Sequence, residues 1–451
     1  MIQTISHKHK MIKKSLAALT FLLFCYAPSA FSQSDTTSMV LSLNKAIEYA
    51  ESNNLQIKNS ELDLLIAKKK IWETTASGLP QISGTGTYLH TFSVPTAVFP
   101  DFSDPTKTQV IPLGVANSTS WNITVTQLVF SGEYIVGLRA SKVYKELSAR
   151  NLAKTKTDIR ESVTTGYFLV LIMEENLNIM KETQSVTNNN LGDIIALGNQ
   201  GLVEETNVDQ LRIIKANIDN AVANLERQSQ WAKNLLKFQL GLDLSTKIEL
   251  SDSLSSYIEG NKLTSSLNSA LNLNANTDYR VALTAEQLQK LNLDRQKTLF
   301  LPTLSAYYQH QKLLNTSSFN FQPEDVFGLT LNVPIFTSGM KLSQLSQARK
   351  QYQQSQNNTR MAEQNLMLAF EKAQNDFKNS YSTYETNKLN LELVKKILTH
   401  TMIKYKEGVA TSSDLYQAEN QYLSTQSDYF NAMNDVLTAK TSLEKLNNNQ
   451  Q

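Results

Sequence analysis

The chain has 451 residues, of which 41% are hydrophobic and 19% are charged. This length allows two or three globular domains or one elongated one. The formal net charge of +2 argues against a nucleic-acid-binding protein, because such proteins usually carry a basic excess. Only 15 glycines and 9 prolines are present, which favours long, uninterrupted helices.

The first 32 residues predict a secretory signal peptide. Lysines between Lys8 and Lys14 precede an apolar run over 16–27, and Ala30 and Ser32 mark a small-x-small cleavage site. The only cysteine, Cys25, lies in this segment, so disulfides and thiolate chemistry are not expected in the mature chain. Beyond it no apolar run is long enough for a transmembrane helix, but strands that enter a membrane remain possible.

The first half of the mature chain changes its hydrophobic period twice. Apolar residues follow helical spacing up to Gly78, then alternate with polar residues as in strands, then return to helical spacing. The expected order is a helix over 41–77, a strand over 82–92, a loop over 95–119, a strand over 121–129, a helix over 133–198, a turn over 201–207, a helix to 240 and an irregular segment over 241–262. The 133–198 helix would be roughly 100 Å long, which indicates a tall, narrow molecule.

The second half repeats this order. Leu301-Pro302 follows Leu79-Pro80 by 222 positions, and Ile335-Phe-Thr-Ser-Gly339 resembles Val129-Phe-Ser-Gly132. Such a duplication indicates two equivalent units. We therefore divide the mature chain into a first structural repeat over 33–262 and a second over 263–451, each with a helix, two strands and a long helical hairpin.

The last hairpin has a seven-residue hydrophobic period on both sides of its turn, which is typical of helices that supercoil around neighbours. Gly408 is expected to end the first helix, and Ser412, Ser413 or Asp414 to cap the second. The residues at this spacing are Phe370, Phe377, Tyr384, Leu391, Leu398 and Tyr405 before the turn and Leu415, Tyr422, Tyr429, Val436 and Leu443 after it.

Taken together, these motifs resemble the TolC-like family of outer-membrane efflux proteins. The resemblance covers the mature chain and rests on the opening Leu-Asn-Lys-Ala-Ile-Glu-Tyr-Ala50, the Leu-Pro pairs, the two Phe-containing strand ends and the turns that begin at Gly201 and Gly408. It implies a mainly α fold with β: an all-α periplasmic helical barrel and an outer-membrane β-barrel formed by a homotrimer, with four strands per protomer. The residues agree independently, since four strands cannot close a barrel and open edges cannot lie in lipid.

The apolar strand residues are expected to face lipid, and their polar neighbours the lumen. The alternative is a soluble sandwich, which would need a second sheet that the pattern does not supply. The expected lipid-facing residues are Trp121, Ile123, Val125, Phe327, Leu329, Leu331 and Val333.

The resemblance also assigns roles around the two turns. The family's periplasmic gate tyrosine falls on Tyr405, and its threonine and aspartate partners fall on Thr206 and Asn207. The gate arginine falls on Ala410, so this chain lacks the family's gate salt links. Asp414 matches the family's lumenal acidic ring, although a simple helix cap explains it equally well and the two roles are compatible.

Exposed small and apolar residues at the turns predict docking of a periplasmic adaptor, or membrane fusion, protein. The residues concerned are Gly201, Leu202, Val203, Gly408, Val409 and Ala410.

No nucleotide-binding loop, paired-acid arrangement or metal-ligand spacing is present, so no catalytic, cofactor or metal site is expected and the chain is not expected to be an enzyme. The sequence therefore predicts the passive exit duct of a tripartite efflux pump or type I secretion system in the outer membrane of a Gram-negative bacterium. An inner-membrane transporter would supply the energy. The alternative is a periplasmic coiled-coil adaptor or scaffold, which would be soluble. The cargo is not encoded in any motif.

Overall fold

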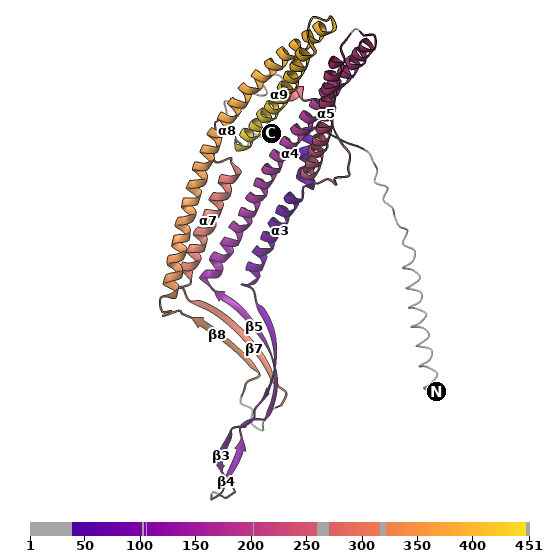
Figure 1. Cartoon of the computed structure of the whole chain (residues 1–451). Coiled ribbons are helices and arrows are strands. Elements are labelled where there is room, and N and C mark those ends of the chain that lie inside the picture. Colours follow the sequence, from indigo (N-terminus) through magenta and orange to yellow (C-terminus); the bar gives the residue numbers. More distant parts are fainter. Residues whose placement is uncertain are drawn as a thin grey trace, which may run out of the picture.

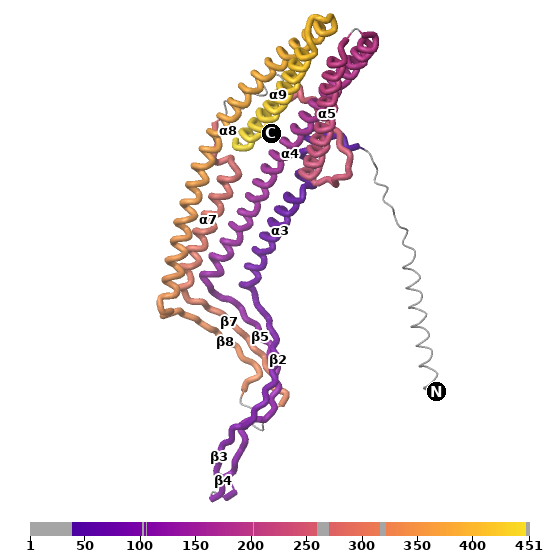
Figure 2. Tube along the Cα trace, in the orientation of Figure 1, coloured from indigo at the N-terminus to yellow at the C-terminus, as the bar shows by residue number. Residues whose placement is uncertain are grey.

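The computed structural model describes residues 38–101, 103–104, 106–201, 203–258, 270–315 and 322–447. The predicted signal peptide, the boundary between the two predicted repeats and Leu202 lie outside these residues. The described chain is long and narrow, with paired helices at one end and a small sheet at the other (Figure 1). Figure 2 traces how each half descends through a helix, enters the sheet and returns through a long helix.

The long helices and the four long strands follow the predicted order, with further short elements between them. The helices are α2 (Leu43–Asn53), α3 (Leu55–Ala76), α4 (Gly132–Asn199), α5 (Glu205–Leu240), α6 (Ser255–Ile258), α7 (Thr277–Thr298), α8 (Met340–Lys406) and α9 (Ser412–Asn447). The strands are β1 (Met39–Leu41), β2 (Gln81–His90), β3 (Thr96–Pro100), β4 (Thr108–Pro112), β5 (Asn117–Phe130), β6 (Ile248–Leu250), β7 (Thr303–Leu313) and β8 (Asp325–Asn332).

The two halves of the chain are built alike. α3 and α7 each have 22 residues, α5 and α9 each have 36, and α4 and α8 have 68 and 67. Asn54 and Asn276 cap α3 and α7 by accepting hydrogen bonds from the amides two and three residues later. Their side-chain amides also donate in the same way, to Gln239 O near the end of α5 and to Leu446 O near the end of α9.

The asparagine cap corrects one prediction. A single helix was expected over 41–77, but Asn54 leaves helical backbone geometry and divides it into α2 and α3. Asparagine competes with helical hydrogen bonding through its side chain, which is why it separates two helices instead of continuing one.

The four long strands form one antiparallel sheet in the order β2-β5-β7-β8. Its register places Ile82 beside Val125, Val125 beside Tyr308, and Tyr308 beside Phe327, so these side chains share one face. Among the described residues, no helix is both long and apolar enough to cross a membrane.

Two strand predictions need correction. The region over 95–119, expected to be a loop, contains the antiparallel hairpin β3–β4, which extends beyond the sheet (Figure 1). The last strand, expected to reach Ile335, ends at Asn332, because Pro334 has no amide to donate to a ladder. Val333 therefore lies just beyond β8.

The irregular segment over 241–262 also contains structure that was not expected. β6 pairs in parallel with β1, and α6 follows it. These elements are only three or four residues long, too short for a hydrophobic period to be visible in the sequence.

The predicted seven-residue stripes are confirmed as packing positions. Phe377, Tyr384, Leu415, Val436 and Leu443 are all buried. Two core clusters result, one around α2, α4, α5, α8 and α9 and one nearer the hairpin tips. The long helices are therefore held by side-chain packing between hairpins, as expected for helices too polar to be stable alone.

Candidate functional site

The turn between α8 and α9 is closed by its glycine. Gly408 has φ +73°, a left-handed conformation that a side chain would disfavour. The amide of Gly408 donates to Tyr405 O at 3.1 Å and that of Val409 donates to Lys404 O at 2.8 Å. These bonds satisfy the last carbonyls of α8 and fix a tight tip. Gly201, at the other tip, has the same φ.

The predicted docking residues differ in their exposure. Val409 is 75% exposed. Val203 and Ala410 instead pack partly against the core cluster at the tips. Leu202 lies outside the described residues. Val409 is thus the apolar side chain that the α8–α9 tip presents to the outside.

Asp414 and Thr411 form a reciprocal helix cap. The Asp414 carboxylate accepts from the Thr411 amide at 2.9 Å and from its hydroxyl at 2.7 Å, while the Asp414 amide donates to the Thr411 hydroxyl at 3.1 Å. The cap therefore begins one residue before the predicted ones. Hydrogen bonds from the Thr411 amide and hydroxyl hold the pKa of Asp414 below its usual value.

The predicted gate residues do not bond to one another within one protomer. Tyr405 is only 8% exposed and packs in the tip core, where its hydroxyl has no hydrogen-bond partner among the described residues. Asn207 Oδ1 instead accepts from the Ser412 hydroxyl at 2.6 Å, and the Thr206 hydroxyl donates to Glu204 at 3.3 Å. Asn207–Ser412 links the two hairpins beside their tips.

A row of buried polar contacts between α4 and α9 was not expected from the sequence. The Thr187 hydroxyl donates to Glu419 Oε1 at 3.2 Å, and the Gln426 amide donates to Asn176 Oδ1 at 2.9 Å. Glu419 is 3% exposed, and its second carboxylate oxygen has no hydrogen-bond partner in the described part of the chain. Burial raises the pKa of Glu419 to about 7.

A sequence signal for this row exists, but its period is eleven residues, not seven. Leu415, Gln426 and Leu437 are all buried at this spacing, and Glu419 and Phe430 are the first two of a parallel row. An eleven-residue repeat keeps one face of a nearly straight helix against a neighbour. The seven-residue stripe alone does not include Glu419 or Gln426.

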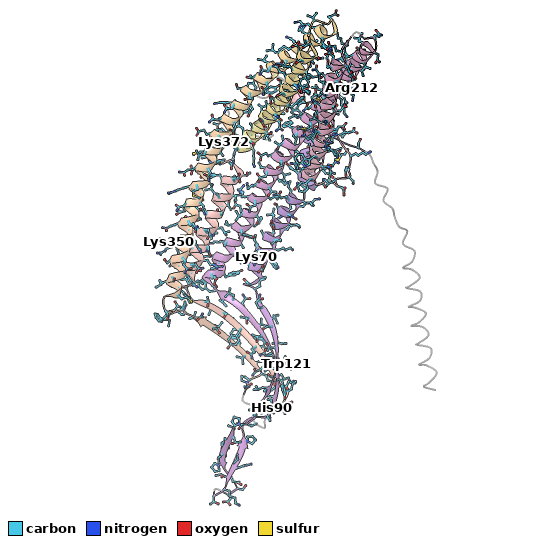
Figure 3. The ribbon with its side chains drawn as sticks, viewed as in Figure 1. Lys70, His90, Trp121, Arg212, Lys350 and Lys372 are labelled. Carbon is cyan, nitrogen blue, oxygen red and sulfur yellow. The ribbon has the colours of Figure 1, made fainter. Side chains whose placement is uncertain are left out.

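The apolar face of the sheet is open in the protomer. Phe327, Leu329 and Leu331 are 71%, 64% and 63% exposed, whereas Trp121 and Val125 are half-buried. Ile123 lies between these two and Val333 follows β8, both exposed. Trp121 lies near the end of the sheet remote from the helices (Figure 3), with its ring 5.4 Å from that of His310.

The opposite face of the sheet is polar and uncharged. The register aligns Thr85 with Asn122 and Asn122 with Gln311, and aligns Thr124 with Gln309. Hydroxyl and amide groups are suited to a water-filled surface, and lipid would leave them unsatisfied. Among the described residues, no group of three or more histidine, cysteine, aspartate or glutamate side chains is placed to hold a metal ion.

Comparison with known proteins gives a sequence match and several structural ones. Residues 263–449 match the family described as "Outer membrane efflux protein". No curated protein matches the chain. Among solved structures, CusC superposes with a TM-score of 0.72 at 16% identity, covering 93% of this chain and 95% of that one. The CmeC outer membrane channel of Campylobacter jejuni gives 0.69 at 16% identity, covering 90% and 85%. The outer membrane protein VceC of Vibrio cholerae gives 0.69 at 14% identity, covering 90% and 96%. These neighbours share the mainly helical fold with a small sheet.

Proposed function

We propose that the chain is an outer membrane efflux protein, as the match over residues 263–449 indicates, and that three copies of it form the exit duct of a tripartite efflux pump or type I secretion system. The observation that carries this proposal is the sheet β2-β5-β7-β8, whose two edges are unpaired among the described residues. One face is mainly apolar, with Lys312, His310 and Asp325 at its end remote from the helices, and the other is polar and uncharged. Such a sheet is suited to a membrane only after other copies close it.

In this arrangement the apolar face contacts outer-membrane lipid and the polar face lines water. Trp121, Ile123, Val125 and the exposed row on β8 lie on the lipid side, with Val333 near the membrane boundary. The helices continue the duct into the periplasm, because α4 and α8 are each about 100 Å long. The duct is passive, and an inner-membrane transporter supplies the energy.

The hairpin tips form the periplasmic end. Three Asp414 carboxylates around the axis make an acidic ring that favours cations, in addition to their role in capping α9. Val409 and the neighbouring glycines dock the periplasmic adaptor protein. Tyr405, Thr206 and Asn207 narrow this end, and a bond from Tyr405 to Thr206 or Asn207 of another copy would require the buried Tyr405 hydroxyl to leave the tip core.

Fractionation of cells tests this function. The exit duct is expected in the outer membrane as a trimer that resists dissociation in detergent until it is heated. A soluble monomeric chain in the periplasm would instead support an adaptor or scaffold. Crosslinking of the intact trimer in cells, followed by purification, is expected to recover an adaptor and an inner-membrane transporter.

A further inference from the structure

The two edge strands of the sheet, β2 and β8, run in opposite directions. Successive strands in the order β2-β5-β7-β8 are antiparallel, so β8 runs opposite to β2. β8 of one copy can therefore pair with β2 of the next as another antiparallel ladder. This inference rests on the proposed function, and it concerns which residues of the two copies meet.

The internal repeat relates the strands of the two halves residue by residue. Leu304 follows Ile82 by 222 positions, and Leu331 follows Val125 by 206. The separation of 222 is also that of the two Leu-Pro pairs, and the separation of 206 is also that of Val129 and Ile335. The structure agrees with both, since Ile82 lies opposite Val125 and Leu304 lies opposite Leu331. β2–β5 and β7–β8 are thus equivalent pairs with the same register.

If a closed barrel is built from these equivalent strand pairs, every ladder that joins one pair to the next can have the same register. The junction present within the chain is β5–β7, in which Val125 lies opposite Tyr308. The equivalent junction between copies is β8–β2. Val125 corresponds to Leu331, and Tyr308 corresponds to Gly86.

We propose that Leu331 in β8 lies opposite Gly86 in β2 of the neighbouring protomer, in a ladder that has the register of β5–β7. By the same relation Val333 lies opposite Gly84. The inward residue Thr330 lies opposite Thr87, as Thr124 lies opposite Gln309 within the chain.

The side chains fit this register. Among the described residues, a side chain at Gly86 would meet no atom within 4 Å, and one at Gly84 would meet only Asn122 O at 3.9 Å, so both positions are open there. Leu331 and Val333 of the neighbouring copy provide the apolar cover that these glycines lack. The fold already contains one such pairing, since a Cβ at Gly328 would lie 2.6 Å from the ring of Tyr307 on the adjacent strand. Glycine within a strand commonly marks a close approach of this kind.

A disulfide between copies tests the register. Within β5–β7, the amide of Leu314 donates to Thr119 O at 2.8 Å, at the position where the register makes them partners. Odd-numbered residues of β5 therefore form hydrogen-bonded pairs with their β7 partners. Even-numbered residues such as Thr124 form non-hydrogen-bonded pairs. Non-hydrogen-bonded pairs bring their Cβ atoms closest, so the equivalent Thr330–Thr87 pair is the best site for a disulfide.

The experiment introduces Thr330→Cys and Thr87→Cys into one chain. The sequence has a single native cysteine, Cys25, within the predicted signal peptide, so the mature protein supplies no competing thiol. Within a protomer the two cysteines lie on opposite edges of the sheet. Mild oxidation followed by heating without reductant is expected to leave covalent dimers and trimers on a denaturing gel, which reductant returns to monomers.

In two matched controls, the cysteine on β2 is moved by two residues in either direction, so that it stays on the same face of the sheet. Thr330→Cys is combined with Thr85→Cys or with Leu89→Cys, which lie on the same face but diagonally, about 7–8 Å away. We expect at least about tenfold less crosslinking in these variants, because that separation exceeds disulfide geometry. Stronger crosslinking in a shifted pair than in Thr330–Thr87 would overturn the proposed register. A native trimer without the Thr330–Thr87 crosslink would also overturn it and leave the proposed function intact. A monomer in native electrophoresis would overturn both.

Discussion

Glu419 should make the stability of the helical hairpins depend on pH. Its carboxylate is buried between α9 and α4, accepts one hydrogen bond from Thr187, and has no cationic partner among the described residues. Burial raises its pKa from 4.5 to about 7 in the folded protein. Folding therefore favours the protonated carboxyl.

The sign and size of the effect follow from this pKa difference. Below pH 4.5 the carboxyl is protonated in both states and contributes no penalty. As pH rises through 4.5 the unfolded chain ionises first, so the free energy of unfolding falls until pH passes about 7 and is then constant. The full penalty is about 3 kcal/mol.

Glu419→Gln removes the ionisation and keeps a side chain that accepts from Thr187. Thermal unfolding of the detergent-solubilised protein, followed by circular dichroism, is measured at pH 5 and pH 8.5. The variant should gain about 2.5 kcal/mol relative to wild type between these pH values, which is less than the full penalty because the unfolded carboxyl is already mostly ionised at pH 5. The amide has its own burial cost, but this offset is the same at both pH values. Glu61→Gln, at an exposed position of α3, is the control. If the gap between Glu419→Gln and wild type is the same at both pH values, Glu419 does not ionise between the hairpins and the reasoning is wrong.

Three further outcomes are expected. Leu331→Arg should cost less than the roughly 2–4 kcal/mol of a midplane position, because Leu331 is two residues from Val333 near the membrane boundary, and Thr330→Arg, on the polar face, should cost less still; equal yields of heat-sensitive trimer would refute the assignment of the faces. Asp414→Asn should lower the cation-to-anion permeability ratio in planar bilayers, and wild-type selectivity should weaken only at a lower pH than for an ordinary aspartate, because hydrogen bonds from Thr411 depress the pKa of Asp414; an unchanged ratio would leave this residue as a helix cap only. Val409→Cys should crosslink in cells to the adaptor, whereas Leu342→Cys, exposed at the other end of α8, should not; crosslinking at both positions would indicate non-specific contact.

The large elements were predictable because each carries a long signal. The duplicated Leu-Pro pairs and the change of period at Gly78 located the long strands, and the absence of proline located α4. β1 and β6 were missed because a three-residue strand has no period. The hairpin β3–β4 was missed because prolines in the sequence usually indicate a loop. Here Pro100 and Pro112 lie at strand ends, where they remove no hydrogen bond from the ladder.

The candidate site was less predictable than the fold, because its details depend on contacts between hairpins. The sequence located both tips through Gly201 and Gly408, whose left-handed backbone is a local requirement. It did not reveal that Tyr405 points into the core, since whether an aromatic side chain at a helix end is buried depends on the hairpin beside it. Glu419 was missed for the same reason, because only the α4–α9 packing makes it a buried charge.

In the proposed assembly, three copies close one duct across the outer membrane. Electron cryomicroscopy of the protein extracted from outer membranes into lipid nanodiscs tests it most directly. We expect a three-fold particle in which β2, β5, β7 and β8 of each copy cross the disc and paired helices extend from one side. A particle whose sheet lies outside the lipid, or whose β2 and β8 edges remain unpaired, would contradict it.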